Sequence, residues 1–146
     1  MTHRLRQLAV APLALAIISA CGQLQDPVSV RDARANATPA GATVGAVYLE
    51  LTAADEDTLL AATTSVADRI EMHTSSEEDG MMRMRPLPSV ELKPGESFRF
   101  APGGAHFMLL GLHQPLVAGT RFPLTLQLQN AGTLTVQVEV KEPGSH

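Results

Sequence analysis

Two runs near the C-terminal end alternate apolar and polar residues, and this pattern constrains the possible folds more than any other feature of the chain. Residues 124–128 alternate Leu with Thr or Gln, and residues 134–140 alternate Leu or Val with polar residues. Successive side chains of a β-strand point to opposite faces, so these runs are typical of strands with one buried face. With the Asn130-Ala131-Gly132 turn between them, they predict an antiparallel hairpin.

Shorter runs of the same kind fill most of the remaining chain. They are residues 47–51, 69–73, 81–85, 98–100 and 106–110. Residues 77–80 (Glu-Glu-Asp-Gly) predict a turn that joins two of these runs in a second hairpin. Residues 58–62 are compatible with a helical turn, but no amphipathic helix is expected after the N-terminal leader. Many short strands separated by turns favour an all-β fold, an antiparallel β-sandwich.

The N-terminal residues have the pattern of a secretion signal. Arg4 and Arg6 precede a mostly apolar run over residues 8–20, which is shorter than the roughly 20 apolar residues of a membrane-spanning helix. The run ends in Ile-Ser-Ala-Cys at residues 18–21, which resembles a bacterial lipobox. Cys21 would then be lipidated and become the new N-terminus. Ordinary secretion with cleavage after Ala20 is the alternative.

These features predict a protein of the bacterial cell envelope, on the extracytoplasmic face and held to the membrane through its lipid anchor only. Net charge is −4, and the chain has one Tyr and no Trp, so neither a basic surface nor stacking aromatics for nucleic acid are expected. The expected organisation is a signal peptide (1–20), a lipidated tether (21–27), one β-domain (28–140) and a tail (141–146).

Histidines and methionines that could bind a metal are concentrated between residues 72 and 113 of the chain. His106 and Met108 are two residues apart in a predicted strand and should therefore share a face, and Met84 lies across the predicted hairpin from His73. Neutral, polarizable thioethers suit Cu(I) and suit Mg²⁺, Ca²⁺ and Zn²⁺ poorly. Methionines in apolar surroundings are, however, more often core residues than ligands, so composition and spacing alone leave both interpretations open.

The spacing of four of these residues resembles a known motif. Ten residues separate the first from the second, twenty-one separate the second from the third, and one separates the third from the fourth: His73, Met84, His106 and Met108. The chain thereby resembles the periplasmic copper-chaperone family PCu(A)C, whose hallmark is H(M)x10Mx21HxM. The sequence around the motif is also similar to that of the family, including Met82-Arg83-Met84-Arg85-Pro86 and Leu92-Lys93-Pro94-Gly95. The likeness covers nearly all of residues 28–140.

The resemblance implies a cupredoxin-like β-sandwich that holds one Cu(I) per chain with His73, Met84, His106 and Met108, and a protein that is not an enzyme. It also implies delivery of copper to the binuclear copper centre of cytochrome c oxidase, often alongside Sco-type thiol proteins. Sequestration of copper for tolerance, without delivery, is the alternative. A lipoprotein that serves in adhesion or assembly is a third interpretation. Electron transfer is the weakest, because blue-copper sites need a thiolate.

Several further residues have open roles at this stage. Met72, Met81 and Met82 are interpreted as packing residues or as a soft rim around the site. His113 is interpreted as a loop residue, although an auxiliary role in copper binding stays open for it, as it does for Met72 and His146.

Overall fold

The computed structural model describes residues 26–144, in which the chain forms ten β-strands and no helix. The predicted signal peptide, Cys21, most of the predicted tether and His146 lie outside the described residues. The strands are β1 (Val28–Asn36), β2 (Val44–Ala53), β3 (Asp57–Thr64), β4 (Ala67–Glu78), β5 (Met81–Pro86), β6 (Val90–Leu92), β7 (Ser97–Phe100), β8 (Ala105–Leu112), β9 (Arg121–Leu128) and β10 (Gly132–Lys141). Within this part of the chain, nothing helical is long and apolar enough to cross a bilayer.

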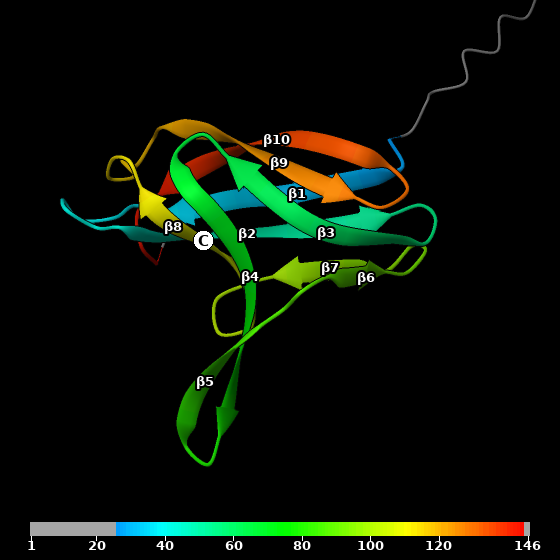
Figure 1. Cartoon of the computed structure of the whole chain (residues 1–146), viewed down its shortest axis with the longest axis horizontal. Coiled ribbons are helices and arrows are strands. Elements are labelled where there is room, and N and C mark those ends of the chain that lie inside the picture. Colours follow the sequence, from blue (N-terminus) through cyan, green and yellow to red (C-terminus); the bar gives the residue numbers. More distant parts are fainter. Residues whose placement is uncertain (1–25, 145–146) are drawn as a thin grey trace, which may run out of the picture.

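The strands form one hydrogen-bonded ladder that folds over into two layers (Figure 1). Its order is β5-β4-β8-β2-β1-β10-β9-β3-β6, with β7 also paired to β2. Neighbouring strands run antiparallel except β1 and β10, which are parallel. The predicted all-β sandwich is therefore confirmed, with one parallel pair that the alternation of residues did not indicate.

Strand β1 belongs to both layers, because it pairs with β2 along one edge and with β10 along the other. Its pairing with β2 changes register between Arg31 and Arg34, and Asp32 between them has a φ of 52°. An extra residue of this kind bends a strand and increases its twist. The bend allows β1 to pass from one layer to the other.

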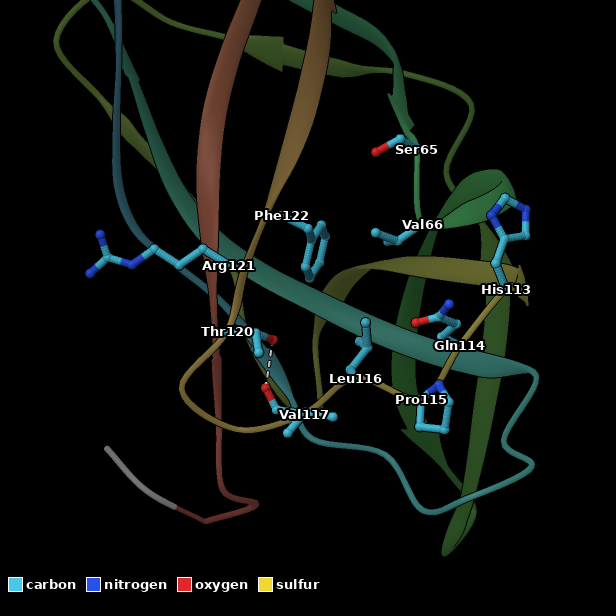
Figure 2. Close-up of a pocket in the computed structure, with 10 residues that line it drawn as sticks. All are labelled: Ser65, Val66, His113, Gln114, Pro115, Leu116, Val117, Thr120, Arg121 and Phe122. Atoms are coloured by element: carbon cyan, nitrogen blue, oxygen red, sulfur yellow. Dashed lines mark hydrogen bonds between the residues drawn. The ribbon is translucent and has the colours of Figure 1, made fainter.

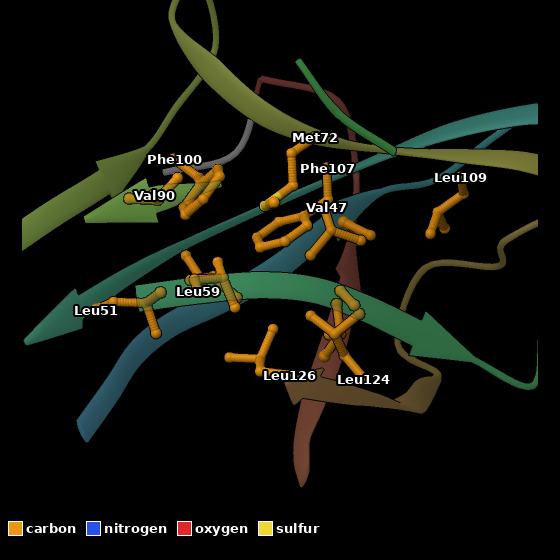
Figure 3. Close-up of a cluster of buried hydrophobic side chains, with 14 of the residues drawn as sticks. Val47, Leu51, Leu59, Met72, Val90, Phe100, Phe107, Leu109, Leu124 and Leu126 are labelled. Carbon is orange, nitrogen blue, oxygen red and sulfur yellow. The ribbon is translucent and has the colours of Figure 1, made fainter. Parts of the chain in front are cut away.

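Apolar side chains from the two layers meet in a single core. Figure 3 shows Met72 of β4 and Phe107 of β8 on one side, and Leu59 of β3 and Leu126 of β9 on the other. Phe107 is fully buried, and its ring stacks on that of Phe100 with 4.2 Å between centroids. Each buried residue of this size contributes about 1.5–3 kcal/mol through removal of apolar surface from water. This core fixes the positions of β4 and β8.

Both predicted hairpins are confirmed. Strands β9 and β10 pair antiparallel from Leu128 opposite Gly132 onward. Strands β4 and β5 pair from His73 opposite Pro86 to Glu78 opposite Met81, so both are longer than the predicted runs. As Figure 1 shows, this second hairpin extends away from the two layers.

The helical turn considered for residues 58–62 is wrong, because these residues lie inside β3. Leu and Ala in this segment are good helix formers. In the fold, however, one edge of β3 pairs with β6 and the other with β9, with an irregularity between Leu59 and Ala61. Hydrogen bonds to two distant strands override the local preference, as is common for strands.

A buried carboxylate joins the beginning of β3 to the turn between β9 and β10. Asp57 is 4% exposed, and its oxygens accept hydrogen bonds from the backbone N–H groups of Thr58 (2.7 Å), Asn130 (2.9 Å) and Ala131 (2.9 Å). Burial opposes its ionisation, but these hydrogen bonds outweigh burial and hold the pKa of Asp57 below its ordinary value of 3.8. Asp57 therefore has a structural role: its hydrogen bonds hold the beginning of β3 against the β9–β10 turn.

Candidate metal centre

The four predicted ligands lie on one face of the β5-β4-β8 part of the sheet. His73 of β4 is directly opposite His106 of β8, so the two imidazoles share a face. Met108 is two residues beyond His106 on the same strand and shares it too. Met84 of β5 is opposite Ser75, which is two residues from His73, and so it also belongs to this face.

His73 occupies the central position among the four. His106 is its direct cross-strand neighbour, and their ring centroids are 6.0 Å apart with an interplanar angle of 85°. Met84 and Met108 are its diagonal neighbours on β5 and β8. Diagonal neighbours have Cα atoms about 7–8 Å apart, within reach of long side chains. The arrangement thus places one further imidazole and two thioethers around His73.

The His73 ring is oriented through its Nε2 atom, which lies 3.1 Å from Oε2 of Glu71. A hydrogen bond from Arg69 holds the pKa of the Glu71 carboxyl below its ordinary value, against the opposing effect of desolvation. An ionised carboxylate only accepts hydrogen bonds, so Nε2 of His73 donates to it. Nδ1 of His73 is left with a lone pair.

The His106 ring is held in the opposite way. Its Nδ1 lies 3.1 Å from the carbonyl oxygen of Gly104, which only accepts, so Nδ1 donates and Nε2 keeps the lone pair. His106 is 8% exposed. Metal-bound histidines usually donate their second ring nitrogen to a carboxylate or carbonyl in this manner, which fixes both tautomer and ring orientation.

The donor set fits a soft monovalent ion. Nδ1 of His73 is buried and has no hydrogen-bond partner, which is costly for a polar atom unless a ligand or ion is its partner. The two thioethers beside the imidazoles favour Cu(I) over harder ions. Among the described residues, no three His, Cys, Asp or Glu side chains are grouped so that they could hold a metal.

Within residues 26–144, the remaining histidine and methionines are placed differently. Met72 points into the core and is 7% exposed, so it is a packing residue (Figure 3). His113 follows the end of β8 and pairs with Asp68 at 2.9 Å, whereas His106 lies near the beginning of that strand. Most of the length of β8 therefore lies between the two histidines. Met81 and Met82 lie on the exposed β4–β5 hairpin.

Sequence reasoning missed Glu71 and Gly104, the residues that orient the two imidazoles. Each precedes its histidine by two positions. In a strand, a residue two positions away has its side chain on the same face, so a carboxylate two residues before a candidate ligand histidine could have suggested Glu71. For Gly104 the partner is a backbone carbonyl, which no residue type indicates.

A cavity of about 410 Å³ lies at the other end of β8. Figure 2 shows Val66, Leu116 and Phe122 around it, while the side chain of Arg121 points away. A smaller cavity of about 250 Å³ adjoins Glu71 and His73 and is bordered by Pro86–Pro88. Neither His73 nor His106 lines the 410 Å³ cavity, so that cavity is separate from the candidate metal centre.

Comparison with solved structures identifies the fold. The copper-bound PCuAC domain from PmoF2 superposes with a TM-score of 0.67 at 20% identity, over 80% of this chain and 94% of that domain. The Cu(I) form of DR1885 from Deinococcus radiodurans superposes with a TM-score of 0.63 at 27% identity, over 86% of this chain and 85% of that one. The expected cupredoxin-like sandwich is thereby confirmed.

Sequence comparison gives the family. Residues 28–140 match the family described as "Putative lipoprotein LpqE-like". "Putative lipoprotein Lxx21020" of Leifsonia xyli subsp. xyli is 31% identical over 122 residues, which cover 83% of this chain and 74% of the relative. The chain therefore belongs to the LpqE-like family of PCuAC proteins.

Proposed function

We propose that this protein is a copper chaperone of the cell envelope that binds one Cu(I) through His73, Met84, His106 and Met108 and has no enzymatic activity. The observation that carries the proposal is the strand register, which puts His73 opposite His106 and both methionines diagonal to His73. The copper-bound states of the PmoF2 domain and of DR1885 support it.

The chemistry of the four donors suits carriage of copper followed by its release. Thioethers are neutral and form labile bonds, so a partner's ligands can replace them one at a time while the metal stays Cu(I). Met84 is 51% exposed, whereas His106 is 8% exposed. We therefore expect exchange to begin at the Met84 side and to end at the imidazoles.

The binding site is tested by removal of the two sulfurs. In the double variant Met84→Leu/Met108→Leu, apolar volume is conserved and both thioethers are lost. We expect Cu(I) affinity, measured by competition with a chromophoric chelator, to fall by at least about 100-fold, with an unchanged circular dichroism spectrum. Met81→Leu, also on β5 and 57% exposed, is the matched control and should bind normally. Unchanged affinity in the double variant contradicts the proposal.

The recipient we propose is the binuclear copper centre of cytochrome c oxidase, with Sco-type thiol proteins as partners, and the location is the extracytoplasmic membrane surface. Membership of a lipoprotein family supports the anchored location. A deletion strain tests delivery: we expect loss of oxidase activity that added copper restores. Copper sensitivity with normal oxidase would instead indicate sequestration.

A further inference from the structure

Three methionines on the β4–β5 hairpin are exposed to solvent in a way that core packing does not explain. Met81 is 57% exposed, Met82 is 62% exposed and Met84 is 51% exposed. Every residue of β5 is exposed. A methionine that fills a core gains stability from burial, and Met72 does so, but these three gain little. Their thioethers are instead available to a ligand.

These three methionines lie on two different faces of the β4–β5 hairpin. Met82 is opposite Glu77, and Met84 is opposite Ser75. Glu77 is four residues from His73 along β4, so Met82 and Glu77 share the face of the four predicted ligands. Met81 is one residue away and therefore belongs to the other face.

The other face has a different chemical character. Met81 is opposite Glu78, whose carboxylate accepts hydrogen bonds from Arg85 at 2.7 and 2.9 Å and contacts Arg83 at 3.2 Å. Two guanidinium groups make this face unfavourable for a cation. On the ligand face, Glu77 adds a carboxylate beside the Met82 thioether, and a nearby negative charge raises the local concentration of cations.

We propose that Met82, assisted by the charge of Glu77, is an outer ligand at which Cu(I) enters and leaves the site. This inference rests on the proposed function. Met82 and Met84 are two residues apart on one strand, so their Cα atoms are separated by about 6.7 Å. Flexible methionine side chains can bridge that separation, and Met84 is in turn the diagonal neighbour of His73.

The step is a ligand exchange without redox change. A bond forms between the Met82 sulfur and Cu(I), and a bond breaks between Cu(I) and one ligand of the molecule that delivers it. A Met84–Cu(I) bond then forms, and the Met82–Cu(I) bond is released as the imidazoles bind. Each sulfur contributes one lone pair, no proton is transferred, and copper stays monovalent throughout.

The test follows each methionine separately. The protein is labelled with ¹³C at the methionine methyl groups and titrated with Ag(I), a redox-inert substitute for Cu(I). Signals are assigned by the variants Met81→Leu, Met82→Leu and Met84→Leu. We expect the Met82 methyl to shift or broaden together with those of Met84 and Met108, while the Met81 and Met72 methyls stay in place.

A kinetic measurement uses the same matched pair. In stopped flow, Met82→Leu should slow Cu(I) transfer from a chromophoric chelator to the protein by about ten-fold, and Met81→Leu should not slow it. A static Met82 methyl while those of Met84 and Met108 shift overturns the inference and leaves the proposed function intact. Equal responses of Met81 and Met82 overturn it as well. If no methionine methyl responds, the proposed function itself fails.

Discussion

At the scale of single residues, the two imidazoles of the candidate site are held by unlike partners. The carboxylate of Glu71 orients His73 through Nε2, and the carbonyl of Gly104 orients His106 through Nδ1. The lone pairs that remain are therefore on different ring atoms, Nδ1 of His73 and Nε2 of His106. Both rings are oriented by groups outside the four predicted ligands, so the geometry of the candidate site depends on more residues than those four.

Asp57 provides a residue-scale prediction for stability. Its pKa is lowered in the folded state, so the carboxylate stabilises the fold fully above its ordinary value of 3.8, and this contribution is lost as the pH falls through the lower folded value. In Asp57→Asn one acceptor oxygen is replaced by a donor, and we expect the free energy of unfolding at pH 7 to fall by about 1–3 kcal/mol.

Denaturant unfolding at several pH values checks this expectation. The wild type should lose stability between about pH 5 and pH 2 more steeply than Asp57→Asn. Asp55→Asn, in the turn just before β3 and exposed, is the control and should keep the wild-type slope. Identical slopes in Asp57→Asn and the wild type would show that the carboxylate makes no such contribution.

No sequence pattern indicates the hydrogen bonds of Asp57. Two of its three hydrogen-bond donors, Asn130 and Ala131, are more than seventy residues away along the chain. The four predicted ligands could be picked out because each has a distinctive side chain at a fixed spacing. A backbone N–H or carbonyl partner, such as that of Gly104, has no residue-type signal and becomes visible only in the fold.

At the scale of elements, local signals decided which strands could be predicted. The β4–β5 turn has Asp79 and Gly80 at φ values of 54° and 75°, as expected for a two-residue turn of type I′. An Asp-Gly pair favours that turn without help from the rest of the chain. No local sequence signal indicates strand β3 or the parallel pairing of β1 with β10, because the strands that pair are distant in sequence.

The β4–β5 turn supports an element-scale prediction. Replacement Gly80→Val puts a β-branched residue at a φ of 75°, which costs about 1–2 kcal/mol. Since β5 is exposed throughout, we expect this cost to disturb the hairpin and not the core. Cu(I) affinity should fall because Met84 is displaced relative to His73, and the Tm should stay within about 2 °C of the wild type.

The control is the corresponding change in the other hairpin. Gly132 has a φ of 79°, and a Cβ atom there, as at Gly80, would meet no neighbouring atom within 4 Å. Gly132→Val should lower the Tm by about 4 °C or more, because β9 and β10 carry core residues, and should leave copper affinity unchanged. Chelator competition and thermal scans on the two variants measure both quantities. The reverse pattern would refute the proposed independence of the hairpin.

At the scale of the whole molecule, the predicted lipid anchor is the feature that would hold the candidate copper site at a membrane surface. Cys21 lies outside the described residues, and the domain begins at β1 a few residues later. We expect the Cys21→Ser variant to leave the membrane fraction, since each buried acyl methylene contributes about 0.8 kcal/mol. Immunoblots of membrane and soluble fractions measure this. Retention of the variant in the membrane fraction would contradict lipid anchoring through this residue.

The bend in β1 at Asp32 has a further consequence for the molecule. Because β1 pairs with β2 in one layer and with β10 in the other, unfolding of either layer would remove pairing partners from the other. We therefore expect the two layers to unfold in one cooperative transition, and the β4–β5 hairpin to open locally far more often than the layers unfold. Local opening of this hairpin would let a metal ion bind and dissociate while the hydrophobic core stays buried, so that the core is not available for aggregation.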